Sequence, residues 1–232
     1  MTGTNNHLGQ PIGAALPSWT TRPFPQRVAM TGRTVRVEPL DPARHAMALH
    51  AAFAEDVTDA GWTYLPYGPF ASADSFGEWA EAAAAKNDPL FFTILPRQGP
   101  PAGLAALQRI DVGNGVAEVG NIHFAPSLSR SIAATEAMYL MMRYVFDDLG
   151  YRRYEWKCDS LNAKSRAAAE RLGFRFEGVF RQAVVYKGRS RDTAWYSIVD
   201  GEWPALKVRF DRWLAAENFD DVGHQRKRLQ DA

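Results

Sequence analysis

The sequence contains very little cysteine, no long apolar run and almost no net charge. Its single cysteine, Cys158, cannot form an internal disulfide or by itself supply a zinc site, so no metal site is predicted. No apolar stretch approaches the roughly 18 to 20 residues that span a bilayer, and the N-terminus lacks the features of a signal peptide. The 27 basic and 26 acidic residues give too little net charge for a nucleic-acid partner. We therefore expect a soluble, cytoplasmic protein that binds no membrane.

Composition divides the 232 residues into three regions. Residues 1–30 are rich in proline and glycine, which predicts an extended N-terminal arm. The arm also carries apolar side chains, so we expect it to lie against the main domain, at 31–200, or against the second subunit of a homodimer. Residues 201–232 are expected to form a C-terminal helix, with an apolar stripe around Trp213, and a polar tail. The basic residues 226–228 need no ligand to explain them.

Hydrophobic periodicity predicts an α/β fold, with a mixed sheet covered by helices on both faces. An Asn-Gly pair at 114–115 is a strong hairpin signal. Strands are predicted at 34–40, 90–95, 102–110, 116–124, 153–157, 174–186 and 193–199. Helices are predicted at 41–54, 74–86, 133–149, 162–172 and 204–217.

Four short segments in the second half carry a family resemblance. Ala133–Ala137 opens a helix after a strand, and Asn162–Ser165, Arg171–Phe174 and Glu177–Gly178 follow at matching intervals. Together they resemble the GNAT (GCN5-related) acetyltransferase superfamily, in particular the branch of ribosomal-protein N-terminal acetyltransferases (RimJ/RimL-like). The resemblance implies a mixed, largely antiparallel seven-stranded sheet with splayed central strands, an acetyltransferase domain over 31–200, and acetyl-CoA as cofactor, with CoA as product.

The phosphate-binding loop departs from the family pattern of Gln or Arg, two residues, Gly, one residue, then Gly or Ala. Here Ser129 replaces the Gln or Arg, and Ile132 replaces the first glycine. Because backbone amides at a helix N-terminus suffice to bind a pyrophosphate, we still expect binding, although Ile132 disfavours positive φ and the loop must take another path. The cofactor-binding residues implied here are Ser129, Arg130, Ser131, Ile132, Ala133, Ala134 and Thr135.

The resemblance also implies that the pantetheine arm lies between two splayed strands, 120–124 and 154–158. A free amide among Ile122, His123 and Phe124 would polarise the thioester carbonyl. Asn162 would hydrogen-bond the cofactor, and Ser165 would be the catalytic residue that protonates the leaving thiolate. The alternative is that Asn162 only starts a helix and Ser165 only fills its first turn.

No general base is chosen from the sequence. Glu118, His123 and Asp159 lie on or beside the two strands, but a hydrogen-bonded strand histidine and a solvated strand glutamate are the simpler interpretations of the first two. The acceptor pocket is expected between the aromatic loop at 62–70 and the late hairpin, with Trp62, Tyr64 and Tyr186 binding substrate. Cys158 is expected to be a buried, inert thiol.

These observations predict an N-acetyltransferase that moves an acetyl group from acetyl-CoA to an amine by direct attack, without a covalent enzyme intermediate. The acceptor is an amine-bearing small molecule, a peptide or a protein N-terminus. The alternative is a non-catalytic acyl-CoA-binding or interaction module on the same fold.

Overall fold

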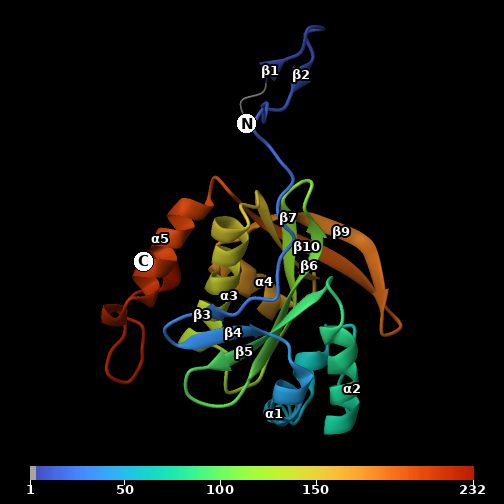
Figure 1. The fold of residues 1–232 in the computed structure, drawn as a ribbon, viewed down its shortest axis with the longest axis vertical. Coiled ribbons are helices and arrows are strands. Elements are labelled where there is room, and N and C mark those ends of the chain that lie inside the picture. Colours follow the sequence, from blue (N-terminus) through green and yellow to red (C-terminus); the bar gives the residue numbers. More distant parts are fainter. Residues whose placement is uncertain (1–3) are drawn as a thin grey trace.

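A single large sheet organises the molecule (Figure 1). The computed structural model describes residues 4–232, and its sheet has eight strands in the order β3-β4-β5-β6-β7-β8-β10-β9. All neighbouring strands are antiparallel except the central pair, β7 and β8, which is parallel. The strands are β3 (Met30–Thr31), β4 (Val35–Pro39), β5 (Leu90–Pro96), β6 (Gly103–Asp111), β7 (Val116–Phe124), β8 (Arg153–Asp159), β9 (Arg175–Tyr186) and β10 (Arg189–Val199).

Helices cover both faces of this sheet, as predicted. On one face, Trp79 of α2 packs against Phe91 of β5, with ring centroids 5.5 Å apart. On the opposite face, Tyr154 of β8 packs against Phe146, which follows α3, and Phe174, which follows α4. The helices are α1 (Pro42–Phe53), α2 (Ala73–Ala84), α3 (Ile132–Arg143), α4 (Ala163–Arg171) and α5 (Trp203–Leu214).

The helix starts follow the capping signals of the sequence. The Asp41 side chain accepts a hydrogen bond from the Arg44 amide at the start of α1, where Pro42 occupies the first turn. The predicted helix at 133–149 is an α-helix only to Arg143, because Tyr144–Asp148 forms a π-helical segment. The sheet also has one strand more than predicted, since the two-residue β3 is too short to show a periodic pattern.

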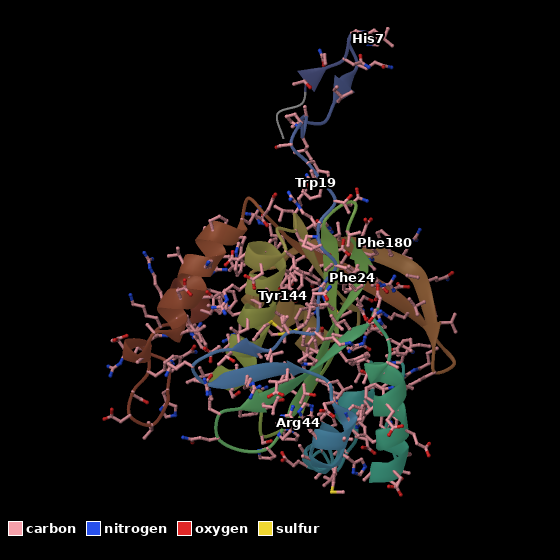
Figure 2. All side chains as sticks on the ribbon, viewed as in Figure 1. His7, Trp19, Phe24, Arg44, Tyr144 and Phe180 are labelled. Atoms are coloured by element: carbon pink, nitrogen blue, oxygen red, sulfur yellow. The ribbon has the colours of Figure 1, made fainter. Side chains whose placement is uncertain are left out.

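The N-terminal arm projects away from the sheet and ends in a small hairpin (Figure 1), formed by β1 (Thr4–Asn5) and β2 (Pro11–Ile12). The first three residues of the predicted arm lie outside the described residues. Figure 2 shows Trp19 where the arm meets the domain, and its indole nitrogen donates to the Gly113 carbonyl at 2.8 Å. Leu8, at the hairpin, remains 69% exposed. Only the second half of the arm therefore lies against the domain.

The C-terminal region folds back onto the domain. Trp213 of α5 is buried and packs against Phe219, so the apolar stripe of this helix is covered within one chain. Asn218 holds the tail, because its side chain accepts from the Lys227 amide at 2.9 Å and donates to the Trp213 carbonyl at 2.9 Å. Leu229, near the end of the chain, is fully buried. Within residues 4–232, no helix is both long and apolar enough to span a bilayer.

Candidate active site

The two central strands, β7 and β8, separate partway along their length. β7 and β8 pair only from Val116, opposite Arg153, to Val119, opposite Trp156. Beyond these pairs, β7 follows β6 and β8 follows β10. A β-bulge with Asn121 at a φ of 51° bends β7 at this point. The predicted splay is confirmed, and it lies at the carboxyl ends of both strands.

Some backbone groups of β7 beyond the bulge are directed away from β6, toward the side of β8. The Ala125 amide donates to a carbonyl that precedes β6, at 2.8 Å, and His123 lies in register with β6. Because backbone groups alternate in direction along an antiparallel strand, those of Ile122 and Phe124 point away from β6 and toward β8. A free amide was expected at one of Ile122, His123 and Phe124; those of Ile122 and Phe124 are available, whereas His123 pairs with β6.

The loop before α3 turns at an arginine instead of a glycine. Arg130 has a φ of 62°, in the left-handed region, whereas Ile132 already belongs to α3. The replacement of the family glycine by Ile132 is therefore accommodated by a turn two residues earlier. Ser131 caps the helix, since its hydroxyl oxygen accepts the Ala134 amide at 3.0 Å.

Three amides at this helix start remain available. Within residues 4–232, the N–H groups of Arg130, Ile132 and Ala133 have no acceptor, whereas the Thr135 amide donates to the Ser131 carbonyl. Arg130 is exposed and, in that range, forms no ion pair. Free amides, the positive end of the helix dipole and a nearby cation fit a diphosphate. The seven residues expected to bind the cofactor therefore surround a helix N-terminus whose first amides have no acceptor within residues 4–232.

The first turn of α4 faces the splayed strand β8. Asn162 is the N-cap of α4, because its side-chain oxygen accepts the Ser165 amide at 3.1 Å. The Ser165 hydroxyl oxygen accepts the Trp156 indole N–H at 2.9 Å. It also contacts the thiol of Cys158, whose pKa is raised by burial although the hydrogen bond from Ser165 opposes that rise. Asn162 therefore caps α4, which was the alternative role considered for it. The Ser165 side chain contacts β8.

The two segments expected to enclose the acceptor are joined by direct contacts. Lys187, at the tip of the β9–β10 hairpin, donates to the Trp62 carbonyl at 2.9 Å, and Arg189 donates to the next carbonyl at 2.9 Å. Tyr64 donates to the carbonyl of Leu161, in the loop before α4, at 3.3 Å. The aromatic loop, the hairpin and the end of β8 therefore form one continuous wall.

Tyr186 and Asp159 form a hydrogen-bonded pair in this wall. The Tyr186 hydroxyl donates to the Asp159 carboxylate at 2.8 Å, and the other carboxylate oxygen accepts the Leu161 amide at 2.9 Å. Burial and the neighbouring carboxylate both raise the pKa of Tyr186. The hydroxyl is therefore protonated at neutral pH.

His123 is enclosed by aromatic rings behind the same wall. Its ring lies 3.9 Å from that of Trp62 and 4.2 Å from that of Phe53, measured between centroids. Burial lowers the pKa of His123 to about 4, with a smaller opposing effect from Asp56. The imidazole is therefore neutral at pH 7. Trp62 is itself only 4% exposed, so its ring lies inside the wall and Tyr64 and Tyr186 are the more accessible members.

The expectation that Glu118 is a solvated strand residue is wrong. Glu118 is buried and accepts from Gln108 at 2.7 Å, with Lys157 3.0 Å away. Burial raises the pKa of Glu118, and the Lys157 ammonium opposes that rise. Glu118 lies on the segment where β7 and β8 are still paired, before the strands separate, and Lys157 directly follows that segment of β8. The opposite charges of the two side chains form an ion pair there.

Sequence reasoning missed a contact of Arg171. Its guanidinium donates to the Thr135 hydroxyl in the first turn of α3 at 3.1 Å. Arg171 belongs to the motif at 171–174, which marked the end of α4, but spacing alone does not show that its side chain reaches another helix.

Comparison with known proteins identifies the class of protein. Residues 34–175 match the model of the acetyltransferase (GNAT) domain. A crystal structure of a GCN5-related N-acetyltransferase from Brucella melitensis is 52% identical, with a TM-score of 0.89, and the match covers 93% of this chain and 98% of that chain. The chain therefore belongs to the GNAT acetyltransferase family and is an acyltransferase.

Two further relatives refine this placement. The ribosomal N-acetyltransferase YdaF of Bacillus subtilis is 29% identical over 63% of this chain and 80% of its own length. The microcin C7 self-immunity acetyltransferase MccE, solved in complex with acetyl-CoA and AMP, shares the fold, with 22% identity and a TM-score of 0.64 over 72% of this chain and 93% of that chain. The similarity to YdaF supports the RimJ/RimL-like branch expected from the sequence, and the similarity to MccE supports the fold.

Proposed function

We propose that this acyltransferase moves an acetyl group from acetyl-CoA to the nitrogen of an amine, with both substrates bound at once. The observations that carry the proposal are the free helix end at Arg130–Ala133 and the separation of β7 and β8, which would form a cleft for the cofactor. A diphosphate fits the first feature, and the two amides of a pantetheine arm fit the unpaired backbone of the second.

The residues at 129–135 would hold the diphosphate. The N–H groups of Arg130, Ile132 and Ala133 would donate to it, and the exposed Ser129 hydroxyl and Arg130 guanidinium would lie beside it. Ser131 would act indirectly, because its side chain already caps α3. Thr135 would also act indirectly, through its contact with Arg171.

The thioester would lie at the level of the bulge. The Phe124 amide, directed into the cleft and free of β6, would donate to the acetyl carbonyl oxygen as negative charge develops there. Ser165, across the cleft, would donate its proton toward the leaving thiolate while its oxygen stays fixed by the Trp156 indole. Asn162 would contribute its free amide group to the pantetheine arm while its oxygen caps α4.

The amine would approach from the wall that holds Tyr64, Tyr186 and, behind them, Trp62. Its nitrogen forms a bond to the acetyl carbon and the carbon–sulfur bond breaks. The proton that the nitrogen loses passes to solvent, and solvent returns a proton to Ser165 after Ser165 has protonated the thiolate. An α-amine with a pKa near 8 is already partly neutral at pH 7, so this step needs little base assistance. The similarity to YdaF, which is named as a ribosomal N-acetyltransferase, supports a peptide or protein N-terminus as the acceptor class.

The direct test is an acetyl-transfer assay with the full chain. Acetyl-CoA is incubated with peptides that carry free α-amines, with ribosomal proteins and with small amines, and free CoA thiol is measured against an amine-free blank. Thiol release above the blank, with mass spectrometry showing one added acetyl group on the amine, is the expected result. Binding of acetyl-CoA without turnover on every amine would instead support the non-catalytic module.

A further inference from the structure

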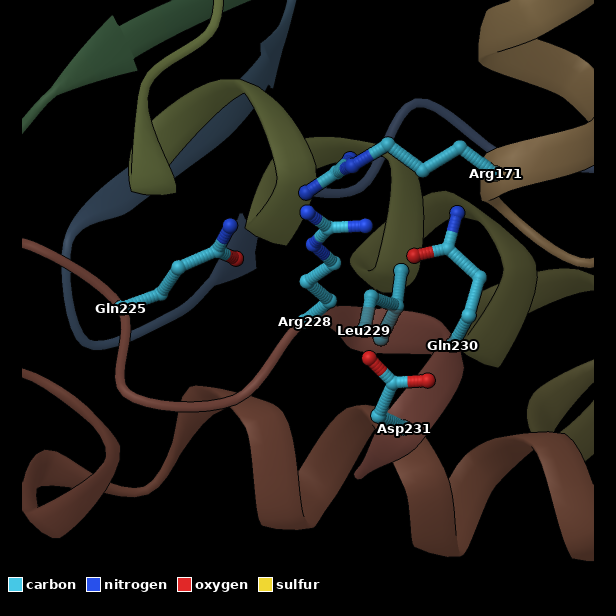
Figure 3. Close-up of a pocket in the computed structure, with 6 residues that line it drawn as sticks. All are labelled: Arg171, Gln225, Arg228, Leu229, Gln230 and Asp231. Atoms are coloured by element: carbon cyan, nitrogen blue, oxygen red, sulfur yellow. The ribbon is translucent and has the colours of Figure 1, made fainter.

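The C-terminal tail helps to form a pocket beside α3, about 380 Å³ in volume (Figure 3). Arg171 enters it from the end of α4, and Arg228 enters it from the tail. The rest of the lining comes from Gln225, Leu229, Gln230 and Asp231. The tail lies beyond residue 175, where the match to the family model ends, so the pocket joins the end of α4 to the C-terminal part of the chain.

The tail segment that carries Arg228 is held firmly. Leu229, the next residue, is fully buried, and the preceding Lys227 is tied to Asn218 through its amide. Gln225 accepts the Trp213 indole N–H at 2.9 Å. Arg228 is therefore placed by contacts on both sides of it in the sequence, although its own side chain is exposed.

Two guanidinium groups and one carboxylate, that of Asp231, line this pocket. Figure 3 shows Arg171 and Arg228 pointing toward one another over α3, with Asp231 on the α5 side of Leu229. Within residues 4–232, neither arginine forms an ion pair. Burial lowers the pKa of Arg171, and no neighbouring carboxylate opposes that decrease. An anion in the pocket could accept hydrogen bonds from both guanidinium groups.

The position of the pocket limits what that anion can be. Arg171 contacts Thr135, which lies in the first turn of α3, so the pocket adjoins the helix end that would take the diphosphate. CoA carries one phosphate group besides its diphosphate, the monoester at the ribose 3′ position. Arginine pairs well with phosphate because several of its N–H groups can bind adjacent oxygens.

We propose that Arg171 and Arg228 bind the 3′-phosphate of the CoA moiety, so that the C-terminal tail contributes to cofactor recognition. This inference rests on the proposed function. The pair would distinguish acetyl-CoA from its 3′-dephospho form, and the tail residue Arg228 would be a determinant of that specificity beyond the matched range 34–175.

Calorimetric titration of the full chain with acetyl-CoA and with 3′-dephospho-acetyl-CoA tests this assignment. Arg228→Ala should weaken acetyl-CoA binding by about tenfold, the usual scale for a hydrogen bond to a charged group, and should leave binding of the dephospho form unchanged. Lys227→Ala is the matched control, because it removes an adjacent exposed cation that does not line the pocket. It should bind both ligands as the wild type does.

Equal effects of Arg228→Ala on the two ligands, or equal effects of the two variants, would overturn the assignment. If the wild type bound neither ligand, the proposed function itself would fail, which is a distinguishable result. Because the Arg228 side chain is exposed, Arg228→Ala should fold as the wild type does. An unchanged melting temperature checks this.

Discussion

Ser165 illustrates how one side chain can be set up for chemistry by its neighbours. Its oxygen accepts an indole N–H from β8, and this contact orients the hydroxyl at the cleft. Ser165→Ala should lower kcat about 10- to 100-fold, because the departing thiolate loses a proton donor, while the KM for acetyl-CoA changes little. Steady-state kinetics checks this expectation.

The matched control for Ser165 is Cys158→Ala, which removes the neighbouring thiol and leaves the hydroxyl in place. Because that thiol is buried and its pKa is raised, the control should retain most of the wild-type kcat. An unchanged kcat in Ser165→Ala would remove the serine from the mechanism and leave it as the partner of Trp156 alone.

At the scale of elements, the β9–β10 hairpin and the aromatic loop work together. Lys187 and Arg189 of the hairpin donate hydrogen bonds to backbone carbonyls of the aromatic loop. The double variant Lys187→Ala and Arg189→Ala should raise the KM for the amine several-fold, because the wall loses its positioning contacts, and leave the KM for acetyl-CoA unchanged. Both constants follow from varying each substrate in turn.

Arg181→Ala is the corresponding control, since this side chain is exposed on the same hairpin and, within the described chain, makes no hydrogen bond to the aromatic loop. Its kinetic constants should match those of the wild type. A rise in the KM for acetyl-CoA in the double variant, or an equal effect of Arg181→Ala, would show that the hairpin does not act on the acceptor side.

The elements themselves follow largely from local sequence, and the site follows only in part. Val116–Phe124 was predicted to the residue, because alternation and a flanking Asn-Gly turn are local signals. The left-handed backbone of Arg130 is not predictable in this way, since a non-glycine residue at positive φ has no recognisable pattern in the sequence. The pairing of Tyr186 with Asp159 and the contact of Arg171 with Thr135 join residues far apart in the chain, so they required the fold.

For the whole molecule, burial of His123 links stability to pH. The folded pKa of about 4 lies below the unfolded value of 6.5, so the unfolded state binds more protons between these values. The stabilisation is therefore complete above pH 6.5 and is lost as pH falls toward 4, by about 3 kcal/mol at most. Urea unfolding at pH 7 and pH 5 measures the loss.

His123→Phe keeps an aromatic ring between Phe53 and Trp62 and removes the proton site. Its free energy of unfolding should fall less between pH 7 and pH 5 than that of the wild type. His224→Gln, which changes an exposed side chain, should behave as the wild type does. An identical pH dependence in all three proteins would contradict the assignment to His123.

The central claim is that the start of α3 binds a diphosphate through its backbone, and titration of Ser131 variants with acetyl-CoA tests it most directly. Asn and Asp both replace Ser well as N-caps, so Ser131→Asn and Ser131→Asp should both retain the melting temperature. Only the aspartate places a negative charge against the bound diphosphate. The account predicts that Ser131→Asn binds acetyl-CoA as the wild type does and that Ser131→Asp binds at least about tenfold more weakly. Equal affinities of the two folded variants would contradict it.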